Sequence, residues 1–473
     1  MITLGLVDSV DTNGVYVTMP GSRGVLRGPY KALSTVAAGT TVLVASTDDG
    51  EQVVVGTAPG GVGSVSVLSF GAKGDGITDD TSAIQAAIDA VHNAGGGVVH
   101  VPHGTYLITG DGLQTRSAMI VGAGARSGGS STAKATVLQG SAQTGPVLTI
   151  EGTGGIGEGG HTDQFFGMRG VKGLTIRGDG VSNEYGLYLH NAHMITIENV
   201  AVRNCRGVPL YSDRAYFVTV NDCQIQEPVG AAANDTYYMH LRQANSWRVR
   251  GLLLHGLSTV TPTVGDSGAV LITHDGSFDS TASDFHILTE QMTMAEGAVG
   301  IIDHRGNVNR IELTAWDSGD HGSVTTPWAA IKLSPGLNDY GGNMVVGSLL
   351  ANYPAGSRTC YGVHLAQSNN SVLAVPGYPD ESVYIASGVQ HSRIELLGSQ
   401  SAPSSGQVVD ASGNSTNHYV DILTARFAQT SLGFFGAAPV ARPTVTGSRS
   451  GNAALASLLT QLANLGLITD SSS

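Results

Sequence analysis

The chain has 473 residues, of which 66 are Gly, while only 13% are charged and 6% are aromatic. This composition favours strands and tight turns and argues against an α-helical bundle. The formal charge of −13, from 24 basic and 37 acidic residues without a Lys/Arg cluster, argues against binding of nucleic acid, whose phosphates require clustered positive charge.

Residues 1–60 contain short stretches of alternating hydrophobicity at 3–7, 15–19, 41–45 and 52–56, separated by DTNG, PGSRG and TDDG turns. They predict a small antiparallel β-barrel, OB-like, with no clustered His, Cys or carboxylates. We interpret this barrel as a docking module, followed by a linker at 61–66. The N-terminus has no Sec-type signal and no apolar run long enough to span a membrane, so we expect neither Sec export nor membrane insertion.

Residues 67–110 predict a strand, a Gly-rich turn, a helix, a triple-Gly stop and two further strands. Asp79 or Asp80 can cap the helix. One helix face is apolar at helical spacing: Ile84, Ala87, Ile88 and Val91. The GAKGDG and GAGARS segments lack the remaining features of nucleotide-binding loops, so phosphate binding is not expected.

The segments FGAKGDGITDDTSAIQAAID and GGGVVHVPHGTYLI, followed by AMIVGAGARSGG and ATVLQG, carry the most specific signal in the chain. They resemble the N-terminal cap and first coils of the pectate-lyase superfamily, in particular its branch in bacteriophage tailspikes and tail-associated depolymerases. The resemblance covers residues 67–140 and implies an all-β, right-handed parallel β-helix with an N-terminal capping helix. It does not imply one activity, because the superfamily includes hydrolases, lyases and proteins that only bind glycans.

Residues 141–400 repeat at intervals of about 20 to 32 residues, most of them about 31, with two strands in most repeats. The last apolar residue of each first strand marks the repeat: Leu189, Leu210, Leu241, Ile272, Ile302, Leu333, Leu365 and Ile385. This periodicity predicts stacked coils of a solenoid, the shaft. An all-β sandwich with evenly spaced strands is the alternative.

If each marker points inward, the residues beside it point outward and form columns along the shaft. The LITHDG and IIDHRG repeats then stack His274 on His304 and Asp275 near Arg305, with Asp303 on the outward face. Carboxylates with imidazoles can supply the acid and base of glycan cleavage, and arginines can bind an acidic or hydroxyl-rich glycan. We therefore predict four catalytic and three substrate-binding residues here: Asp275, Asp303, His274 and His304; Arg242, Arg305 and His240. The alternative is a purely structural ladder of hydrogen bonds and ion pairs.

A second acidic cluster follows in IELTAWDSGDHGS, where Glu312, Trp316 and Asp317 are further candidates for substrate binding. In the competing interpretation, Trp316 packs against the shaft and the acids are solvated. The segments expected of a polygalacturonase are incomplete, so its catalytic residues cannot be carried over. No cofactor is expected and no metal site is predicted; the spacing of the acids gives no support for Ca²⁺.

Residues 401–443 form an irregular strand and loop region, and 444–473 contain a short amphipathic helix with leucines at 455, 458, 462 and 465. Two heptads predict self-association, with capping of the shaft as the alternative. Both ends of the chain resemble phage tail proteins, which implies a homotrimeric spike of the virion tail, made in the host cytoplasm and docked to baseplate proteins. It would bind and cleave a host cell-surface polysaccharide, as a glycosidase or lyase; the alternatives are a non-catalytic receptor-binding spike and, more remotely, a secreted plant-wall enzyme.

Overall fold

The computed structural model places strands β1–β5 in a closed barrel, in the order β1-β2-β3-β5-β4. Neighbouring strands are antiparallel except β3 and β5, which pair in parallel. The five strands are β1 (Ile2–Asp11), β2 (Gly14–Thr18), β3 (Leu26–Ala32), β4 (Thr41–Ser46) and β5 (Gln52–Thr57). The predicted closed N-terminal barrel is thereby confirmed, with the parallel β3–β5 pair as the one departure from the predicted antiparallel pairing.

The structure describes residues 2–472 except 12–13, 19–25, 33–40, 47–51, 58–62, 126–134, 143–144, 153–168, 227–228, 230–236, 257–267, 275, 277, 291–299, 317–327, 339, 349–359, 376–380, 397–407, 414–417, 423–430, 433–439, 442–443, 449 and 465–467.

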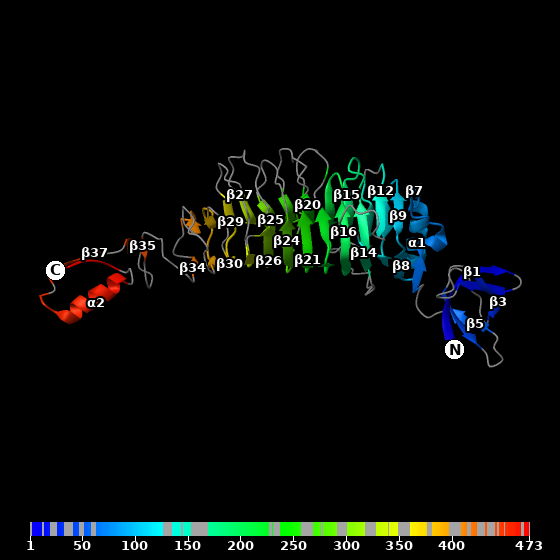
Figure 1. Ribbon diagram of the computed structural model, residues 1–473, viewed down its shortest axis with the longest axis horizontal. Coiled ribbons are helices and arrows are strands. Elements are labelled where there is room, and N and C mark those ends of the chain that lie inside the picture. The colour runs from blue at the N-terminus through cyan, green and yellow to red at the C-terminus, as the bar shows by residue number, and fades with distance from the viewer. Residues whose placement is uncertain are drawn as a thin grey trace.

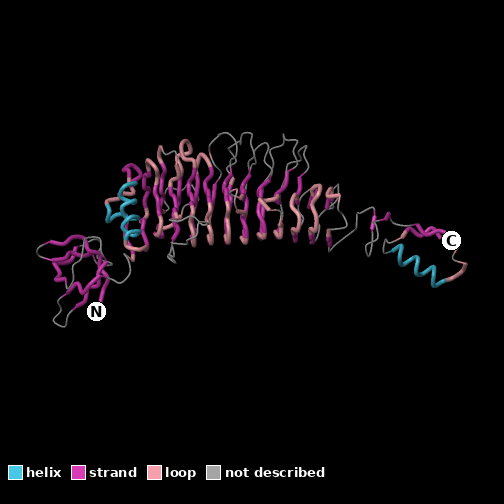
Figure 2. Tube along the Cα trace, turned by 180° about the vertical axis from the view of Figure 1, so that it is seen from behind, coloured by secondary structure: helices cyan, strands magenta, loops and turns pink. Residues whose placement is uncertain are grey.

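The cap of the shaft begins with β6 (Ser64–Ser66), a 3-10 turn (Val67–Phe70) and β7 (Asp75–Asp79), and continues with α1 (Thr81–Asn93), β8 (Gly97–Val101) and β9 (Gly104–Ile108). Helix α1 lies at one end of the stacked coils (Figures 1 and 2). Its four predicted apolar residues are all buried in the core, as expected for a helix that covers the open end of a sheet.

Two parallel sheets form the shaft, so each coil contributes strands to both. The 12-stranded sheet contains β10 (Leu113–Thr115), β13 (Leu148–Glu151), β15 (Tyr185–His190), β17 (Val208–Asp213), β20 (Tyr237–Arg242), β22 (Gly268–Thr273), β25 (Gly300–Asn307), β27 (Trp328–Ser334), β29 (Cys360–Leu365), β31 (Glu381–Ile385) and β33 (Val408–Asp410), with β23 (Ser280–Thr281) paired at its side.

The 17-stranded sheet joins β6–β9 to β11 (Ala118–Gly122), β12 (Thr136–Gly140), β14 (Arg169–Arg177), β16 (Ile195–Arg203), β18 (Thr219–Asn221), β19 (Gln224–Gln226), β21 (Arg248–His255), β24 (Asp284–Glu290), β26 (Arg310–Trp316), β28 (Met344–Ser348), β30 (Ser371–Val375), β32 (Arg393–Leu396) and β34 (Tyr419–Ile422). The predicted parallel β-helix is confirmed (Figure 1), and a sandwich is ruled out because the strands of both shaft sheets pair in parallel.

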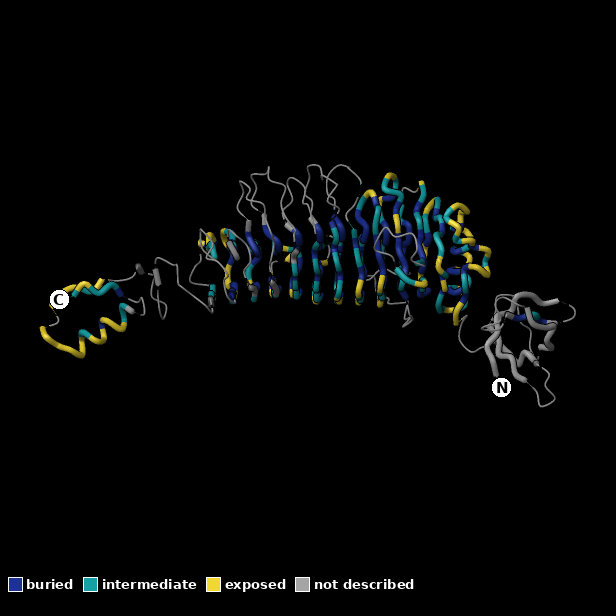
Figure 3. Tube along the Cα trace, in the orientation of Figure 1, coloured by how far each residue is buried: buried dark blue, intermediate teal, exposed yellow. Residues whose placement is uncertain are grey.

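The core lies inside the shaft, where buried residues recur from coil to coil (Figure 3) and are mostly aliphatic. All eight apolar markers of the repeats are buried. Parallel pairing with alternate side chains inward explains this, because equivalent inward positions then fall in register along the shaft. Cys205 and Cys223 are buried thiols, and burial raises the pKa of Cys205 to about 12.

The C-terminal part contains β35 (Ser431–Leu432), β36 (Val440–Ala441), β37 (Thr444–Gly447), α2 (Ala453–Asn464) and β38 (Thr469–Ser472). The predicted amphipathic helix is present as α2. Leu455 and Leu458 are exposed, whereas Leu459 is buried. Leu465 lies outside the described residues. Self-association through α2 remains a prediction.

Candidate functional site

The outer face of the 12-stranded sheet carries two columns of side chains that, apart from Leu271, are polar or aromatic. Strand register defines both, because each residue pairs with its equivalent on the next coil. The central column is Tyr188, Tyr211, His240, Leu271, Asp303, Lys332, His364 and Tyr384. The edge column, at the ends of the strands, contains Glu151, His190, Asp213, Arg242 and Thr273. We call these two columns together the outer row.

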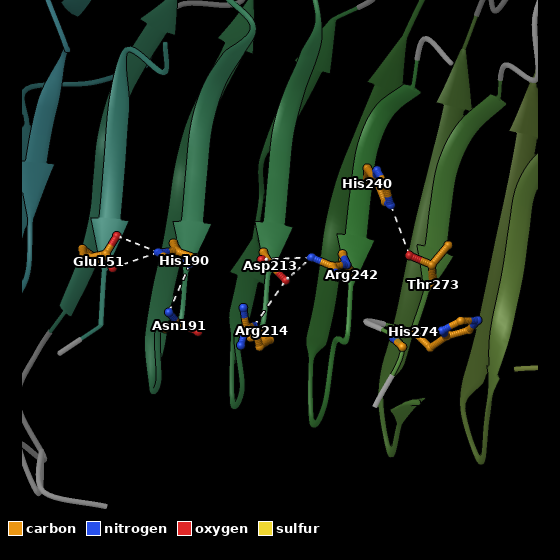
Figure 4. A network of polar contacts seen from close by, with 10 residues as sticks. Glu151, His190, Asn191, Asp213, Arg214, His240, Arg242, Thr273 and His274 are labelled. Atoms are coloured by element: carbon orange, nitrogen blue, oxygen red, sulfur yellow. Dashed lines mark hydrogen bonds and ion pairs between the residues drawn. The ribbon is translucent and has the colours of Figure 1, made fainter. Parts of the chain in front are cut away.

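The edge column begins with an acid and an imidazole. His190 Nδ1 lies 2.8 Å and 3.0 Å from the two carboxylate oxygens of Glu151, and His190 Nε2 lies 3.1 Å from Asn191 Nδ2 (Figure 4). Strands β13 and β15 are neighbours, which places the two side chains on one face. A partly exposed carboxylate bound to an imidazole can move a proton to or from a bound sugar.

Charged pairs continue along the edge. Asp213 lies 3.3 Å from Arg242 and 3.6 Å from Arg214 (Figure 4). His240 Nε2 lies 3.2 Å from the hydroxyl of Thr273. Burial, with the nearby charges of Arg242 and Arg305, lowers the pKa of His240 to about 4, so this imidazole is neutral near pH 7.

Tyrosine rings form the first part of the central column. Tyr185 stacks on Tyr211 at a centroid distance of 4.6 Å, and Tyr188 lies 5.3 Å from Tyr211. Tyr211 in turn meets His240 edge-on at 5.2 Å. Burial raises the pKa of Tyr185, Tyr188 and Tyr211 above the ordinary value, so all three stay neutral. Neutral, partly exposed rings of this kind can stack on sugar faces.

Asp303 lies near the middle of the central column, between Leu271 and Lys332. Its side chain is only 2% exposed, and its Oδ2 accepts hydrogen bonds from Arg305 at 2.7 Å and 3.2 Å. Its other oxygen, Oδ1, is buried without a hydrogen-bond partner among the residues that the structure describes. An unpaired buried carboxylate oxygen is costly, which makes this position a candidate for chemistry.

The predicted stacking of His274 on His304 is wrong. Ile272, not His274, pairs with His304, so His274 lies two positions beyond that level. His304 points into the shaft, where it is fully buried and its Nε2 lies 2.9 Å from Asn309 Nδ2. Burial lowers the pKa of His304 to about 4. A side chain inside the core cannot contact a glycan, so the surface position predicted for it is corrected.

Of the second acidic cluster, the described residue Glu312 lies apart from the outer row. Glu312 lies on β26 in the 17-stranded sheet, where it pairs with Arg310 at 2.6 Å and with His286 at 3.7 Å. Trp316 ends the same strand, but its side chain is not described, and Asp275 and Asp317 lie outside the described residues. Glu312 and Asp303 therefore lie on different sheets and do not share one binding surface, while substrate binding by Glu312 remains a prediction.

Sequence reasoning missed most of the outer row, although the sequence contains a signal for it. Aromatic or imidazole side chains recur three residues apart in the YGLYLH, YYMHLR and YGVHL strands. In the structure these pairs are Tyr185 with Tyr188, Tyr237 with His240 and Tyr361 with His364, at ring distances of 5.6, 6.2 and 6.1 Å. The predicted residues Arg242, His240, Asp303 and Arg305 do lie together on this face.

Within the described residues, no group of three His, Cys, Asp or Glu side chains is arranged to hold a metal ion. None of the described helices is long and apolar enough to cross a bilayer.

Residues 64–282 match the sequence profile of the family described as Rhamnogalacturonase A/epimerase, pectate lyase-like. The pectate-lyase-like resemblance seen in the cap and first coils is thereby confirmed for this part of the chain.

Three curated proteins show what this chain resembles in sequence. Depolymerase 1 of Klebsiella phage KN3-1, named as specific for capsule KN3, is 31% identical over 193 residues, or 37% of this chain and 22% of that protein. Mannuronan C5-epimerase AlgE6 of Azotobacter vinelandii is 37% identical over 158 residues, which are 30% of this chain and 16% of that protein. Alginate lyase 7 of the same bacterium is 58% identical over 55 residues, which are 12% of this chain and 6% of that protein. The match thus spans less than a quarter of each of these relatives.

Among solved structures, the A-module of mannuronan C-5 epimerase AlgE4 from Azotobacter vinelandii has a TM-score of 0.44 at 16% identity, covering 76% of this chain and 95% of that module. ORF18 of Geobacillus virus E2 has a TM-score of 0.42 at 15% identity, covering 76% and 69%.

Proposed function

We propose that this protein binds a polysaccharide on the outer row of its 12-stranded sheet and cleaves it, as a depolymerase carried on a phage tail. Partly exposed tyrosines beside charged groups on a long flat face suit a chain of sugars better than a small molecule. The resemblance to a phage depolymerase and to enzymes named for mannuronan and alginate supports a polysaccharide as the substrate.

The observation that carries the proposal is the unpartnered Oδ1 of Asp303. Arg305 holds this carboxylate in place through Oδ2 and leaves Oδ1 without a partner among the described residues, so Oδ1 is the oxygen that can act as a base towards a sugar proton, or as a nucleophile towards a sugar carbon. The Asp303 carboxyl is almost fully buried beneath Arg305, whose side chain is 42% exposed. A sugar can therefore contact the carboxyl only if it binds the Arg305 guanidinium in place of Asp303. The same group would then offset negative charge on the substrate.

His240 and His364 flank this centre two coils away on either side. Burial and neighbouring cations lower both pKa values to about 4, so both rings accept hydrogen bonds from sugar hydroxyls at neutral pH. His274, directly after strand β22, and Asp275, outside the described residues, stay proposed contributors to catalysis, and Trp316 and Asp317 stay proposed glycan contacts.

The test compares wild type, Asp303→Asn and a matched control, Asp284→Asn, on a panel of purified acidic and neutral bacterial capsular and wall polysaccharides. Asp284 is also an ion-paired aspartate, held by Arg250 and Arg310, but it lies on the 17-stranded sheet. Reducing ends report any cleavage, and absorbance of unsaturated uronate separates a lyase from a hydrolase. We expect Asp303→Asn to lower kcat about 100-fold or more and Asp284→Asn to match wild type.

Equal cleavage by Asp303→Asn and wild type would move the reaction away from Asp303, and the Glu151–His190 pair would be the next acid–base group to test. If wild type binds a polysaccharide of the panel without releasing fragments, the protein is a non-catalytic receptor-binding spike. The ion pairs of Arg242 with Asp213 and of Arg305 with Asp303 favour that second function, because guanidinium groups held in place on the surface can bind a glycan without any bond being broken.

Docking of the β1–β5 barrel to baseplate proteins and a homotrimeric assembly complete the proposal for a tail spike. Leu455 and Leu458 on α2 are exposed apolar residues in support of self-association. Light scattering of the full chain tests the assembly: a monomeric mass would contradict it.

A further inference from the structure

A second aromatic cluster lies on the outer face of the 12-stranded sheet, on strands β29 and β31. Tyr361 stacks on Tyr384 at a centroid distance of 4.8 Å, and His364 meets Tyr384 edge-on at 5.0 Å. Tyr361 is buried, whereas His364 and Tyr384 are partly exposed. The buried ring of Tyr361 thus packs beneath the cluster, and the rings of His364 and Tyr384 are accessible from solvent. The Tyr185–Tyr211 stack also has accessible rings.

Strand register places the two aromatic clusters symmetrically about Asp303. Tyr211 is three paired strands before Asp303, through His240 and Leu271. Tyr384 is three paired strands after Asp303, through Lys332 and His364. At a strand spacing of about 4.8 Å, each ring lies roughly 14 Å from Asp303 along the shaft.

Charge differs between the clusters and the centre. The tyrosines near Tyr211 are neutral because burial raises their pKa values, and His364 is neutral because burial and Lys332 lower its pKa to about 4. Neutral rings bind sugars through stacking, whereas along the central column the charged groups Asp303 and Lys332 lie between the clusters, with Arg305 paired to Asp303. The edge column adds the ion pair of Asp213 with Arg242 beside the first cluster. Each end of the central column is thus suited to holding a chain and its middle to acting on it.

We propose that Tyr384 and His364 form a second sugar-stacking platform, matched to a first platform at Tyr188 and Tyr211, so that one glycan lies along the shaft across both. The binding part of this inference stands on the two clusters; its consequence for cleavage rests on the proposed function. A chain held on both sides of Asp303 is cut internally, so the protein acts as an endo-enzyme. A chain that reaches both rings spans roughly 29 Å, or about six sugar units.

The experiment uses the polysaccharide that the panel identifies, divided into long chains of more than ten sugars and short chains of fewer than four. It measures the Kd of the protein for each fraction. The variants are Tyr384→Ala, Tyr211→Ala and the conservative Tyr384→Phe. Tyr419→Ala is the matched control, because Tyr419 is an exposed tyrosine of the 17-stranded sheet, with Arg393 lying 5.4 Å from its ring centroid. Thermal unfolding of each variant shows that it is folded.

We expect Tyr384→Ala and Tyr211→Ala each to weaken binding of long chains about tenfold, to a value close to that of short chains, with Tyr384→Phe and Tyr419→Ala unchanged. If Tyr384→Ala binds long chains as tightly as Tyr419→Ala does, the second platform is overturned, whether or not cleavage occurs. If both platform variants weaken binding but wild type releases no fragments, the platforms stand and the proposed cleavage fails. Early products of one or two sugars would overturn the internal cut.

Discussion

His304 shows, at the scale of one residue, how a polar side chain can hide the register of a repeat. The last apolar residue of its strand is Ile302, which pairs with Val270 rather than with the marker Ile272. The inward series continues one step further, to His304, where other coils carry Leu241 or Leu333. Choosing the last apolar residue as the marker therefore selects Ile302, two residues before His304, the residue that pairs with Ile272. The columns predicted for this coil are shifted by the same two residues.

Outward residues were predicted better than their partners. Alternation from a buried marker is enough to place Arg242 and His240 on the outer face, and the structure confirms this position. Their partners Asp213 and Thr273 come from neighbouring coils, so identifying them needs the register between coils. A local pattern does not contain that information.

Lys332 is the cation of the central column with the clearest role to test. Arg242 and Arg305 are paired with carboxylates, whereas no ion pair involves Lys332 within the part of the chain that the structure describes. We expect Lys332→Met to weaken binding of an acidic polysaccharide about tenfold, with a reduced salt dependence, and Lys332→Arg to retain binding. Isothermal titration at two salt concentrations measures both effects.

Lys172→Met is the control for this prediction, because Lys172 pairs with Glu198 at 2.7 Å on the other sheet. The same loss of affinity in both variants would show that net charge, and not the position of Lys332, controls binding.

At the scale of elements, the cap was predictable from its sequence and the charged ladder of the 17-stranded sheet was not. Helix α1 has local signals for its start, its apolar face and its end, and all three lie within about thirty residues. The ladder joins Arg250 and Arg310 to Asp284, and Arg310 to Glu312, across three coils. Only the stacked strands bring these groups together.

The two candidate caps of α1 have different roles. Asp79 accepts hydrogen bonds from the backbone N–H of Thr81 at 3.0 Å and from its hydroxyl at 2.6 Å. Asp80 turns away from the helix and accepts the N–H groups of Lys73 at 2.6 Å and Gly74 at 3.0 Å. Asp80 is buried and thus fixes the Gly-rich turn before the helix.

We expect Asp80→Ala to lower the free energy of unfolding by about 2 kcal/mol or more, because it leaves two N–H donors in the cap without their acceptor. Urea unfolding followed by circular dichroism measures this. Asp75→Ala is the comparison: Asp75 accepts the N–H groups of Ile77 and Thr78 at an exposed turn, so water can replace it and the loss is smaller. A larger loss for Asp75→Ala would contradict this account of the turn.

At the scale of the whole molecule, one buried imidazole, His304, and two partly exposed ones, His240 and His364, make the shaft sensitive to acid. The pKa values of His240, His304 and His364 are lowered from 6.5 to about 4, chiefly by burial. Between pH 6.5 and 4 the unfolded chain binds protons at these sites and the folded chain does not. Stability from these residues is therefore complete above pH 6.5 and is lost as the pH falls towards 4.

We expect the Tm to fall steadily from pH 7 to pH 4.5, with about three protons taken up on unfolding in that window. His304→Leu, which restores the aliphatic residue of neighbouring coils, is expected to fold normally and to reduce the pH slope by about a third. Calorimetry at several pH values measures this slope. A flat Tm over the window, or an unchanged slope in His304→Leu, would contradict the prediction.

The stacking of coils through neighbours alone has a consequence for how such a chain changes during evolution. Between Tyr211 and Tyr384 each strand of the row bonds to the one before and the one after it, and β25 also bonds to the short strand β23 within its own region. Duplication or loss of one coil in this interval would alter the distance between its two ends by a single strand spacing, about 4.8 Å, and leave the remaining coils intact. The length of glycan that the row can hold would thus be set by the number of coils between its two ends.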